Sequence, residues 1–270
     1  MRDVYLQKNL LIYIFSYNRP MQLDALLASM FHYSKPYPEI VVQYKTTSKE
    51  AKYAYQLLSE KYKEINFIQE CDFQKTLLSS LMQNQNYGFI SFLVDDIIFM
   101  RKFDFKEILN IMDDRSIYSL RLGLNLSISK IVNKPQELPN LERKKSFYSW
   151  WWNEGVLDWG YPHSLDGNIF PFEYISSLIR QIKFRAPNSL ENKLSQKKID
   201  NSFIGICSKE SVLVNLPFNR VQNEVKNWSA NFDVDILIRD FLDGRRIDFL
   251  SYGNRMISSV HEDWEMNVTG

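Results

Sequence analysis

The sequence predicts a doubly wound α/β fold, in which a mostly parallel sheet is flanked by helices. Short apolar runs alternate with segments of helical periodicity over roughly residues 10–100, a pattern typical of parallel sheets. The run from Phe89 to Val94 is apolar nearly throughout, as buried parallel strands are. A chain of 270 residues with 45% hydrophobic residues can bury one large core. We therefore expect a single domain over residues 1–270.

The first part of the chain divides into alternating strands and helices. The apolar run Leu10 to Phe15 ends in a turn-rich segment, Ser16 to Pro20, after which apolar residues recur at helical spacing. The β-branched run 39–44 predicts the next strand, and the alternation then continues to the Phe89 run. The expected elements are strands at 10–15, 39–44, 65–68 and 89–94, and helices at about 23–31, 48–62 and 73–82.

Beyond residue 100 the periodicity weakens. The polar, Pro-containing stretch 131–149 predicts a long loop before the cluster Trp150-Trp151-Trp152. Large aromatic residues mostly lie in cores, but three consecutive tryptophans cannot all face one way, so at least one is expected near a site. The other expected elements are a strand at 116–122, a turn at 164–170 that leads into a helix containing Tyr174, Leu178 and Ile179, a strand at 211–217 and a helix at 233–242.

Composition excludes several classes of function. Lys and Arg number 33 against 32 Asp and Glu, a net charge of +1, so no global electrostatic term attracts the chain to nucleic acid or anionic lipid. The apolar runs are too short to span a bilayer, or are interrupted by charge, and the N-terminus lacks a signal peptide's cleavage site. The distant cysteines Cys71 and Cys207 predict no disulfide framework. We expect a cytoplasmic protein with at most peripheral contact with the inner face of the cell membrane.

Polar residues follow the first and fourth expected strands. In α/β sheets, ligands bind beyond the carboxyl ends of the strands, so the loop Ser16 to Pro20 and the pair Asp95-Asp96 are expected to face one crevice. Adjacent carboxylates in such a crevice need a cation, and Mn²⁺ or Mg²⁺ prefers carboxylate and phosphate oxygens. The alternative is that the pair only ends the strand and caps the next turn.

The segments Phe15-Ser16-Tyr17-Asn18-Arg19-Pro20 and Phe92-Leu93-Val94-Asp95-Asp96 together resemble GT-A-fold glycosyltransferases, especially the family-2-like group. The resemblance implies a nucleotide-sugar-binding half at 1–100 and an acceptor-binding, catalytic half at 101–270. It also implies a metal at the aspartates; since one outer aspartate of the usual Asp-x-Asp is missing, Asp96 is assigned to the metal and Asp95 to the ribose or the metal's waters. The implied donor-binding residues are Phe15, Ser16, Tyr17, Asn18, Arg19 and Asp95.

The second half is expected to hold the acceptor site. Residues 158–167 contain two acids, a histidine and aromatic rings, and aromatic rings pack on the apolar faces of sugars. An inverting transferase needs a carboxylate to deprotonate the acceptor hydroxyl. Asp166 is the first candidate, with Glu154 and Asp158 in reserve, although an Asp before a helix can be a plain cap. The expected acceptor-binding residues are Trp159, Tyr161, His163 and Glu154.

His261, in a Ser-Ser-Val-His-Glu-Asp-Trp segment near the C-terminus, is the second expected metal ligand. In many GT-A enzymes a C-terminal histidine closes over the donor, and imidazole suits Mn²⁺. His163 is its rival for this role. A lone histidine near a chain end is also often a simple surface residue.

The resemblance implies an enzyme, a hexosyltransferase that acts by inversion rather than retention. It would move a sugar from a nucleotide-diphosphate sugar to a saccharide or lipid-linked saccharide in bacterial lipopolysaccharide or capsule synthesis. One alternative is a catalytically silent carbohydrate- or nucleotide-sugar-binding protein on the same fold. A nucleotidyltransferase is disfavoured because the Ser16 to Pro20 loop has no glycine. The donor base, the acceptor and the oligomeric state stay open.

Overall fold

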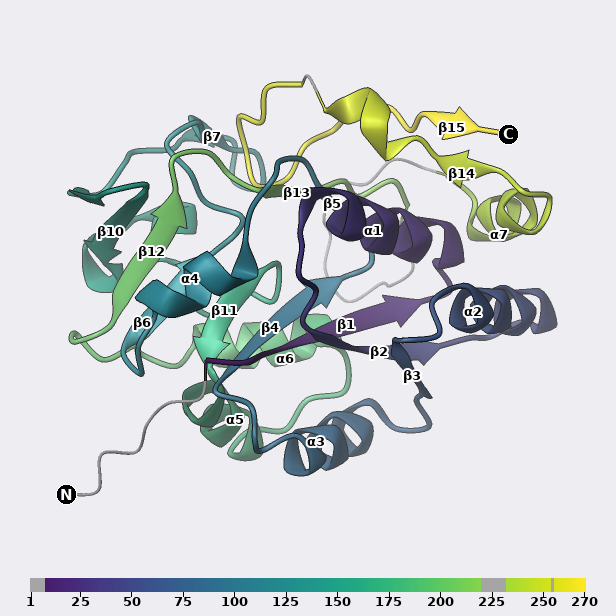
Figure 1. Ribbon diagram of the computed structural model, residues 1–270, viewed down its shortest axis with the longest axis horizontal. Helices are drawn as coiled ribbons and strands as arrows, with labels where there is room; N and C mark the ends of the chain where they lie inside the picture. Colours follow the sequence, from purple (N-terminus) through teal and green to yellow (C-terminus); the bar gives the residue numbers. More distant parts are fainter. Residues whose placement is uncertain (1–7, 220–231, 254) are drawn as a thin grey trace.

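The computed structural model describes residues 8–219, 232–253 and 255–270. Its centre is a nine-stranded sheet in the order β3-β2-β1-β4-β11-β6-β12-β10-β9 (Figure 1). Of these strands only β11 and β10 run against the others, so the predicted mostly parallel α/β class is confirmed. The strands are β1 (Leu10–Tyr17), β2 (Glu39–Lys45), β3 (Asn66–Gln69), β4 (Phe89–Val94), β6 (Ser116–Ser119), β9 (Glu142–Lys144), β10 (Phe147–Trp151), β11 (Asn168–Pro171) and β12 (Ile204–Ser208).

The β1 strand forms the centre of the parallel part because it is apolar on both faces. Its Tyr13 lies opposite Val41 of β2 and Phe92 of β4, and the rings of Phe15 and Phe92 stack at 5.8 Å between centroids. A strand buried on both faces places the next residues of the chain at the carboxyl edge of the sheet. Ser16 and Tyr17, the last two residues of β1, lie at this edge.

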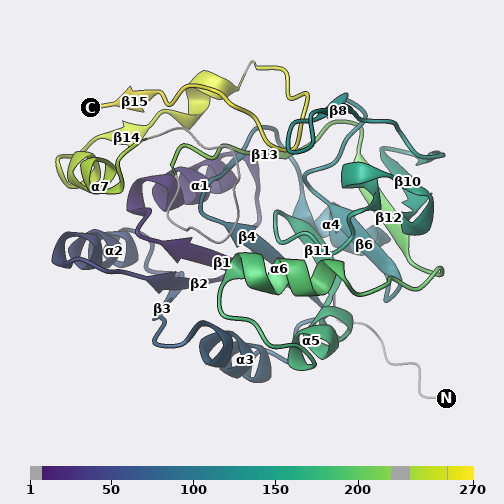
Figure 2. The same ribbon diagram turned by 180° about the vertical axis from the view of Figure 1, so that it is seen from behind.

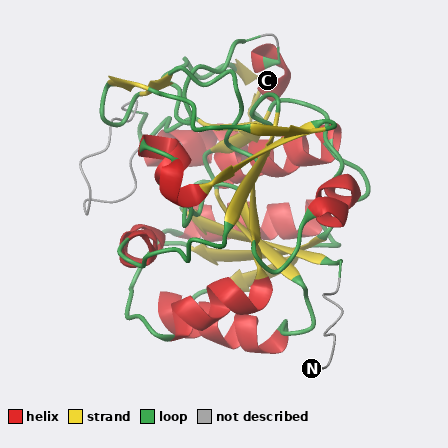
Figure 3. Cartoon of the chain, turned by 90° about the vertical axis from the view of Figure 1, so that its left-hand side faces the viewer, coloured by secondary structure: helices red, strands yellow, loops and turns green. Residues whose placement is uncertain are grey.

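Helices cover both faces of the sheet (Figure 3). Helices α1 (Pro20–Tyr33), α2 (Lys49–Lys61) and α7 (Val234–Leu242) contact one another. On the other side, α3 (Phe73–Gln83), α5 (Phe172–Arg180) and α6 (Pro187–Ser195) follow one another (Figure 2). A further helix, α4, spans Phe105–Ile111. Helices α1, α2 and α3 begin at residues that favour helix starts. Pro20 is the first residue of α1, and the side chains of Ser48 and Asp72 cap α2 and α3.

Three small two-stranded sheets complete the fold. One joins β13 (Leu213–Asn215) to β5 (Ile97–Phe99), one joins β14 (Arg246–Ile247) to β15 (Val268–Thr269), and one joins β7 (Ile128–Ser129) to β8 (Lys134–Pro135). Asn215 also forms an isolated bridge to His261. The C-terminal segment, which runs over the same side of the molecule as α1 (Figure 1), is thereby brought to β13, the partner of the strand β5 that follows Asp96.

The tryptophan cluster is mainly core. Trp150, Trp152 and Trp159 are buried and their rings pack edge to face at 4.7–4.8 Å between centroids, while Trp151 is 46% exposed. Two short 3-10 helices, η1 (Trp152–Glu154) and η2 (Leu157–Gly160), carry the chain around the cluster, and a third, η3, spans Phe249–Tyr252.

Several expectations for the second half are wrong. The stretch 131–149 is not a long loop, because it contains β8, β9 and the start of β10. The turn at 164–170 does not lead directly into a helix, because β11 intervenes and inserts between β4 and β6. Helices α4 and α6 and strand β12 were not expected. Short, irregular elements of this kind are stabilised by tertiary packing and carry little periodicity.

Among the described residues, no helix combines the length and the apolar character that crossing a bilayer requires.

Candidate active site

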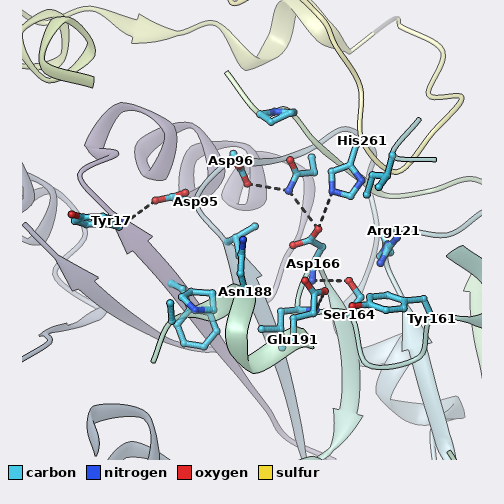
Figure 4. Close-up of a pocket in the computed structure, with 18 of the residues that line it drawn as sticks. Tyr17, Asp95, Asp96, Arg121, Tyr161, Ser164, Asp166, Asn188, Glu191 and His261 are labelled. Carbon is cyan, nitrogen blue, oxygen red and sulfur yellow. Dashed lines mark hydrogen bonds and ion pairs between the residues drawn. The ribbon is translucent and has the colours of Figure 1, made fainter. Parts of the chain in front are cut away.

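A cavity of about 1140 Å³ opens at the carboxyl edge of the parallel strands, with walls from both halves of the chain (Figure 4). Residues after β1 and β4 form one wall, and residues from η2, from the turn before β11 and from α6 form the other. The prediction that the first loop and the Asp95-Asp96 pair face one crevice is confirmed. Of the expected donor-binding residues, those that line this cavity are Phe15, Ser16, Tyr17, Arg19 and Asp95.

Asp95 joins the first loop to the end of β4. Its Oδ2 accepts hydrogen bonds from the Ser16 hydroxyl at 2.8 Å and from the Tyr17 N–H at 3.0 Å, and its Oδ1 accepts from Arg19 Nη1 at 2.9 Å. Both carboxylate oxygens therefore hold the protein's own loop. A contact of Asp95 with ribose or with metal-bound water stays a prediction.

Arg19 supplies the cation that two adjacent buried carboxylates require. Its Nη1 lies 2.9 Å from an oxygen of Asp95 and 2.9 Å from an oxygen of Asp96, and its Nη2 donates to the carbonyl oxygen of Asn219. The charge of Arg19 is therefore already neutralised within the protein, and a contact of Arg19 with the donor stays a prediction.

Asn18 does not line the cavity. Its side-chain amide forms two hydrogen bonds with Thr47: Nδ2 donates to the Thr47 hydroxyl at 2.6 Å, and Oδ1 accepts from the Thr47 N–H at 3.0 Å. With φ at 54°, Asn18 adopts a left-handed conformation that asparagine tolerates better than most residues. Its part is to shape the loop, which corrects the expectation that it binds the donor.

A chain of polar contacts crosses the cavity from Asp96 to His261 (Figure 4). The Nδ2 of Asn215 lies 3.0 Å from Asp96 Oδ1 and 3.5 Å from Asp166 Oδ2. The same Asp166 oxygen lies 3.4 Å from His261 Nε2. Four side chains from distant parts of the sequence thus meet at one point, and three of them were expected site residues.

The two aspartates of this chain of contacts differ in their affinity for protons. Burial raises the pKa of Asp96 to about 6, against the opposing effect of Arg19, and the charges of Asp95 and Asp166 add to the rise. Burial also favours protonation of Asp166, but His261 outweighs it, together with Arg121 and Asn215, and holds the pKa of Asp166 below its ordinary value.

Asp166 is not a helix cap, because β11 follows it and the residue before α5 is Pro171. It sits in a turn where Gly167 has φ at 91°, a conformation that glycine adopts without strain. The Gly167 N–H donates to the Phe92 carbonyl at 2.9 Å, and its carbonyl accepts from the Leu120 N–H at 3.0 Å. These bonds fix Asp166 beside the ends of β4 and β6.

The residues present fit a divalent ion only if the substrate completes its coordination. The described part of the chain contains no group of three or more His, Cys, Asp or Glu side chains that could hold a metal. Magnesium sites, however, often use one or two carboxylates plus substrate phosphates. His261 Nδ1 and Asn215 Oδ1 are buried and find no hydrogen-bond partner among the described residues, so each keeps a lone pair that the protein does not use. Metal binding by Asp96 and His261 stays a prediction.

Three of the four residues that were expected to bind the acceptor do not line the cavity. Trp159 is fully buried and its carbonyl accepts from Trp150 Nε1 at 3.1 Å, so it is a core residue. His163 is also buried, and its Nε2 lies 2.7 Å from the Tyr174 hydroxyl; this position excludes it as a rival metal ligand. Glu154 is exposed and is not among the residues that line the cavity. Tyr161 does line it.

Sequence reasoning missed one of the residues that give this side of the cavity its charge, and did not foresee the pairing of two others. Asp158, expected only as a reserve base, forms a buried ion pair with Arg121, a residue that residue type alone would place on the surface. Glu191 of α6 also lines the cavity. Burial and the nearby charge of Asp166 raise its pKa to about 7. A glutamate in a polar helical segment looks like an ordinary surface residue, so no pattern in the sequence indicates its place in the site.

Comparisons with known proteins indicate the class of protein that this chain resembles. No protein-family model matches the chain. The chain is 25% identical over 282 aligned residues to the bifunctional glycosyltransferase pgtA of Dictyostelium discoideum, which covers 92% of this chain and 36% of that protein. The chain thus spans about a third of the relative's length. This similarity confirms the resemblance to glycosyltransferases that the loop at Ser16 and the Asp95-Asp96 pair indicated.

Solved structures with related folds are more distant. Residues 1–349 of S. aureus TarS align with a TM-score of 0.48 and 15% identity, covering 76% of this chain and 59% of that one. The apo bifunctional glycosyltransferase WbbM aligns with a TM-score of 0.38 and 13% identity, covering 72% and 38%. A Methanothermobacter nucleotidyl transferase aligns with a TM-score of 0.43 and 10% identity, covering 91% and 99%. Similarities at this level say nothing about activity or substrate.

Proposed function

We propose that this chain is a glycosyltransferase that moves a sugar from a nucleotide-diphosphate sugar to a saccharide acceptor. The observation that carries the proposal is the meeting of Asp96, Asn215, Asp166 and His261 in one cavity at the carboxyl edge of the sheet. Ligand sites of α/β folds lie at this edge. The similarity to pgtA supports the class of reaction.

On the donor side, the nucleoside occupies the part of the cavity beside Phe15, Ser16 and Tyr17. Tyr17 offers an aromatic ring to a base, and Lys45 Nζ lies 5.8 Å from the centre of that ring, so a cation is at hand for phosphate. Gln43 of β2 also lines this part. The wall therefore combines an apolar surface with a few polar groups, as nucleotide sites do.

The diphosphate lies next to Asp96 and His261, which would hold Mn²⁺ or Mg²⁺. When bound, the ion neutralises the negative charge that the diphosphate gains as it leaves. Asn215 fixes the orientation of the Asp96 carboxylate. Arg19 keeps that carboxylate from repelling Asp95.

On the acceptor side, a hydroxyl oxygen of the acceptor attacks the anomeric carbon while the bond from that carbon to the diphosphate oxygen breaks. In an inverting reaction a carboxylate takes the hydroxyl proton, and Asp166 is the residue that the sequence indicated. The cavity holds a second carboxylate, Glu191, that competes for this role. Bacterial surface-polysaccharide synthesis at the inner face of the membrane, with a lipid-linked saccharide as acceptor, is the biological setting that we propose.

A catalytically silent nucleotide-sugar-binding protein is the second candidate. It is favoured by the Arg19 guanidinium, which already satisfies both Asp95 and Asp96 and so competes with a metal ion for these carboxylates. Binding would then persist without a divalent ion, and no sugar would be transferred.

The test is a thermal-shift screen of UDP, GDP, CDP and dTDP, each with and without Mn²⁺. A ligand at about a hundred times its dissociation constant adds about 2.7 kcal/mol, which raises the midpoint by roughly 5–10 °C. We expect one nucleotide to bind in a metal-dependent way and Asp96→Asn to abolish the shift. Asp114→Asn, which changes an exposed carboxylate outside the cavity, is the matched control.

Turnover separates the two candidates. The nucleotide sugars of the bound base are incubated with the protein and a panel of octyl glycosides, and release of nucleoside diphosphate is followed. Release that depends on Asp96 supports the transferase. Binding without release, unchanged in Asp96→Asn, would support the silent binding protein instead.

A further inference from the structure

Glu191 extends from α6 into the acceptor side of the cavity, beside Asp166 (Figure 4). Its Oε1 accepts a hydrogen bond from the Leu165 N–H at 3.0 Å, and the Ser164 hydroxyl also bonds to the carboxyl group. Glu191 is therefore attached to the turn that carries Asp166. Two carboxylates from different elements flank the same space.

Glu191 has no cation of its own among the described residues. None of the ion pairs between these residues includes it. The charged and titratable groups that face it are Asp166, Arg121 and Tyr161, and the Arg121 guanidinium is already paired with Asp158. A carboxylate in this position is free to bind a proton or a hydroxyl group of a ligand.

Asp166, in contrast, is engaged by the protein. Its Oδ2 lies within 3.5 Å of both Asn215 Nδ2 and His261 Nε2. A base must offer a free lone pair within hydrogen-bond reach of the proton that it removes. Asp166 contacts Asn215 and His261 through Oδ2, whereas Glu191 bonds to Leu165 and Ser164 and, among the described residues, to neither of those two side chains.

We infer that Glu191, rather than Asp166, takes the proton of the acceptor hydroxyl. The inference rests on the proposed function. The hydroxyl oxygen forms its bond to the anomeric carbon, the bond from that carbon to the diphosphate oxygen breaks, and the hydroxyl proton passes to the carboxylate of Glu191. Nucleoside diphosphate leaves with the electron pair of the broken bond. Asp166 is then a positioning residue for Asn215 and His261.

The acidity of Glu191 supports this role. Burial and the charge of Asp166 raise its pKa to about 7. A general base works best when its pKa lies near the operating pH, because it is then both deprotonated and basic enough.

The test compares Glu191→Gln, Glu191→Asp and Asp166→Asn with the wild type. In Glu191→Gln the new amide oxygen can still accept from the Leu165 N–H, so this variant loses basicity and keeps the hydrogen bond of the fold. Glu173→Gln, a substitution on α5 of a glutamate whose side chain is 81% exposed, is the matched control. Release of nucleoside diphosphate from UDP-glucose, UDP-GlcNAc and GDP-mannose is followed with octyl glycosides as acceptors, from pH 5 to 9.

We expect Glu191→Gln to lower kcat about 10²- to 10⁴-fold with the donor KM and the nucleotide thermal shift unchanged. Glu191→Asp should recover part of the activity. The wild-type rate should rise with pH through about 7, and in Asp166→Asn this rise should move to lower pH, because a negative charge next to Glu191 has been removed.

Two outcomes would overturn the inference, and they are distinguishable. If Glu191→Gln keeps its activity and pH profile while Asp166→Asn loses a hundredfold or more in kcat, Asp166 is the base and only this inference is wrong. If the wild type releases no nucleoside diphosphate from any of these donors, the proposed function fails and the inference fails with it.

Discussion

Arg121 and Asp158 form a buried ion pair in the wall of the cavity, with side chains only 4% and 9% exposed. Arg121 Nε and Asp158 Oδ2 find no further partner among the described residues, so the pair is not fully satisfied. Such a pair adds little net stability, but removing one member leaves the other charged and buried.

Replacing Arg121 by Met should therefore lower the free energy of unfolding by about 3–5 kcal/mol. The matched control is Arg101→Met, because Arg101 pairs with Glu210 through side chains that are 30% and 50% exposed; it should cost about 1 kcal/mol or less. Urea unfolding monitored by circular dichroism measures both. If both variants lose the same free energy of unfolding, breaking the buried pair at Arg121 costs no more than breaking an exposed pair, and the prediction is wrong.

Glu191 should make stability depend on pH. Its pKa is raised from 4.5 to about 7 in the folded state, so the folded state binds the proton more tightly than the unfolded state does. The resulting stabilisation is fully present below about pH 4.5 and is lost as pH rises through 7. Relative to Glu191→Gln, the wild type should lose about 1–3 kcal/mol between pH 4.5 and pH 8. Urea unfolding of both proteins at both pH values measures this loss. If the difference in unfolding free energy between them does not change with pH, the pKa of Glu191 is not raised in the folded state.

At the residue scale, the sequence predicted best where a residue follows a strongly apolar strand. Ser16, Asp95 and Asp96 line the cavity as expected because the ends of β1 and β4 lie side by side. Trp159 and His163 were misassigned because residue type alone does not say which way a side chain faces in an irregular segment. In the structure both side chains are buried, which shows that they point into the core.

At the element scale, the pairing of β10 with β12 depends on one glycine. Trp150 lies opposite Gly205 in the register of these strands, and a Cβ on Gly205 would come within 2.3 Å of the Trp150 ring. The flat ring fills the space that a side chain would take. This contact seats the tryptophan cluster, and Trp150 Nε1 in turn holds the carbonyl of Trp159 in η2, next to Asp158.

Gly205→Ala should accordingly destabilise the protein by about 1–3 kcal/mol through overpacking. In a Trp150→Ala background the same substitution should cost much less, because the ring that it meets is gone. Urea unfolding of the four proteins of this double-mutant cycle gives the coupling energy. Equal costs in both backgrounds would show that Trp150 is not the group that the added methyl meets.

The elements of the first half were predictable for a physical reason. Three parallel strands of this half, β1, β2 and β4, are largely buried and need apolar runs, and the helices between the strands need amphipathic periodicity. In the second half, β11 is only four residues long and antiparallel to both neighbours. Its place between β4 and β6 is set by long-range hydrogen bonds, which leave no periodic trace in the sequence.

At the scale of the whole molecule, one continuous sheet crosses the boundary near residue 100. β4 of the first half pairs with β11 of the second, and the cavity has walls from both halves. A fragment ending near residue 100 would expose one edge of β4 and lose half of the cavity. The two halves expected from the resemblance thus share one sheet and one cavity.

Calorimetry should therefore show a single unfolding transition for the full chain, with a calorimetric enthalpy equal to the van't Hoff enthalpy. A bound nucleotide should raise this single transition without splitting it. The fragment 1–100, expressed alone, should show no cooperative transition. Two separate transitions in the full chain would mean that its halves fold independently.

The sequence by itself determined the parallel α/β core and the crevice formed by the first loop and the Asp95-Asp96 pair, because strand burial and strand order follow from local apolar patterning. Only the tertiary structure decided that Arg19 neutralises that pair and that Asn215 and Glu191 share the site with Asp166. These groups lie far apart in sequence, and what they do depends on burial and on neighbouring charge, which local pattern does not encode.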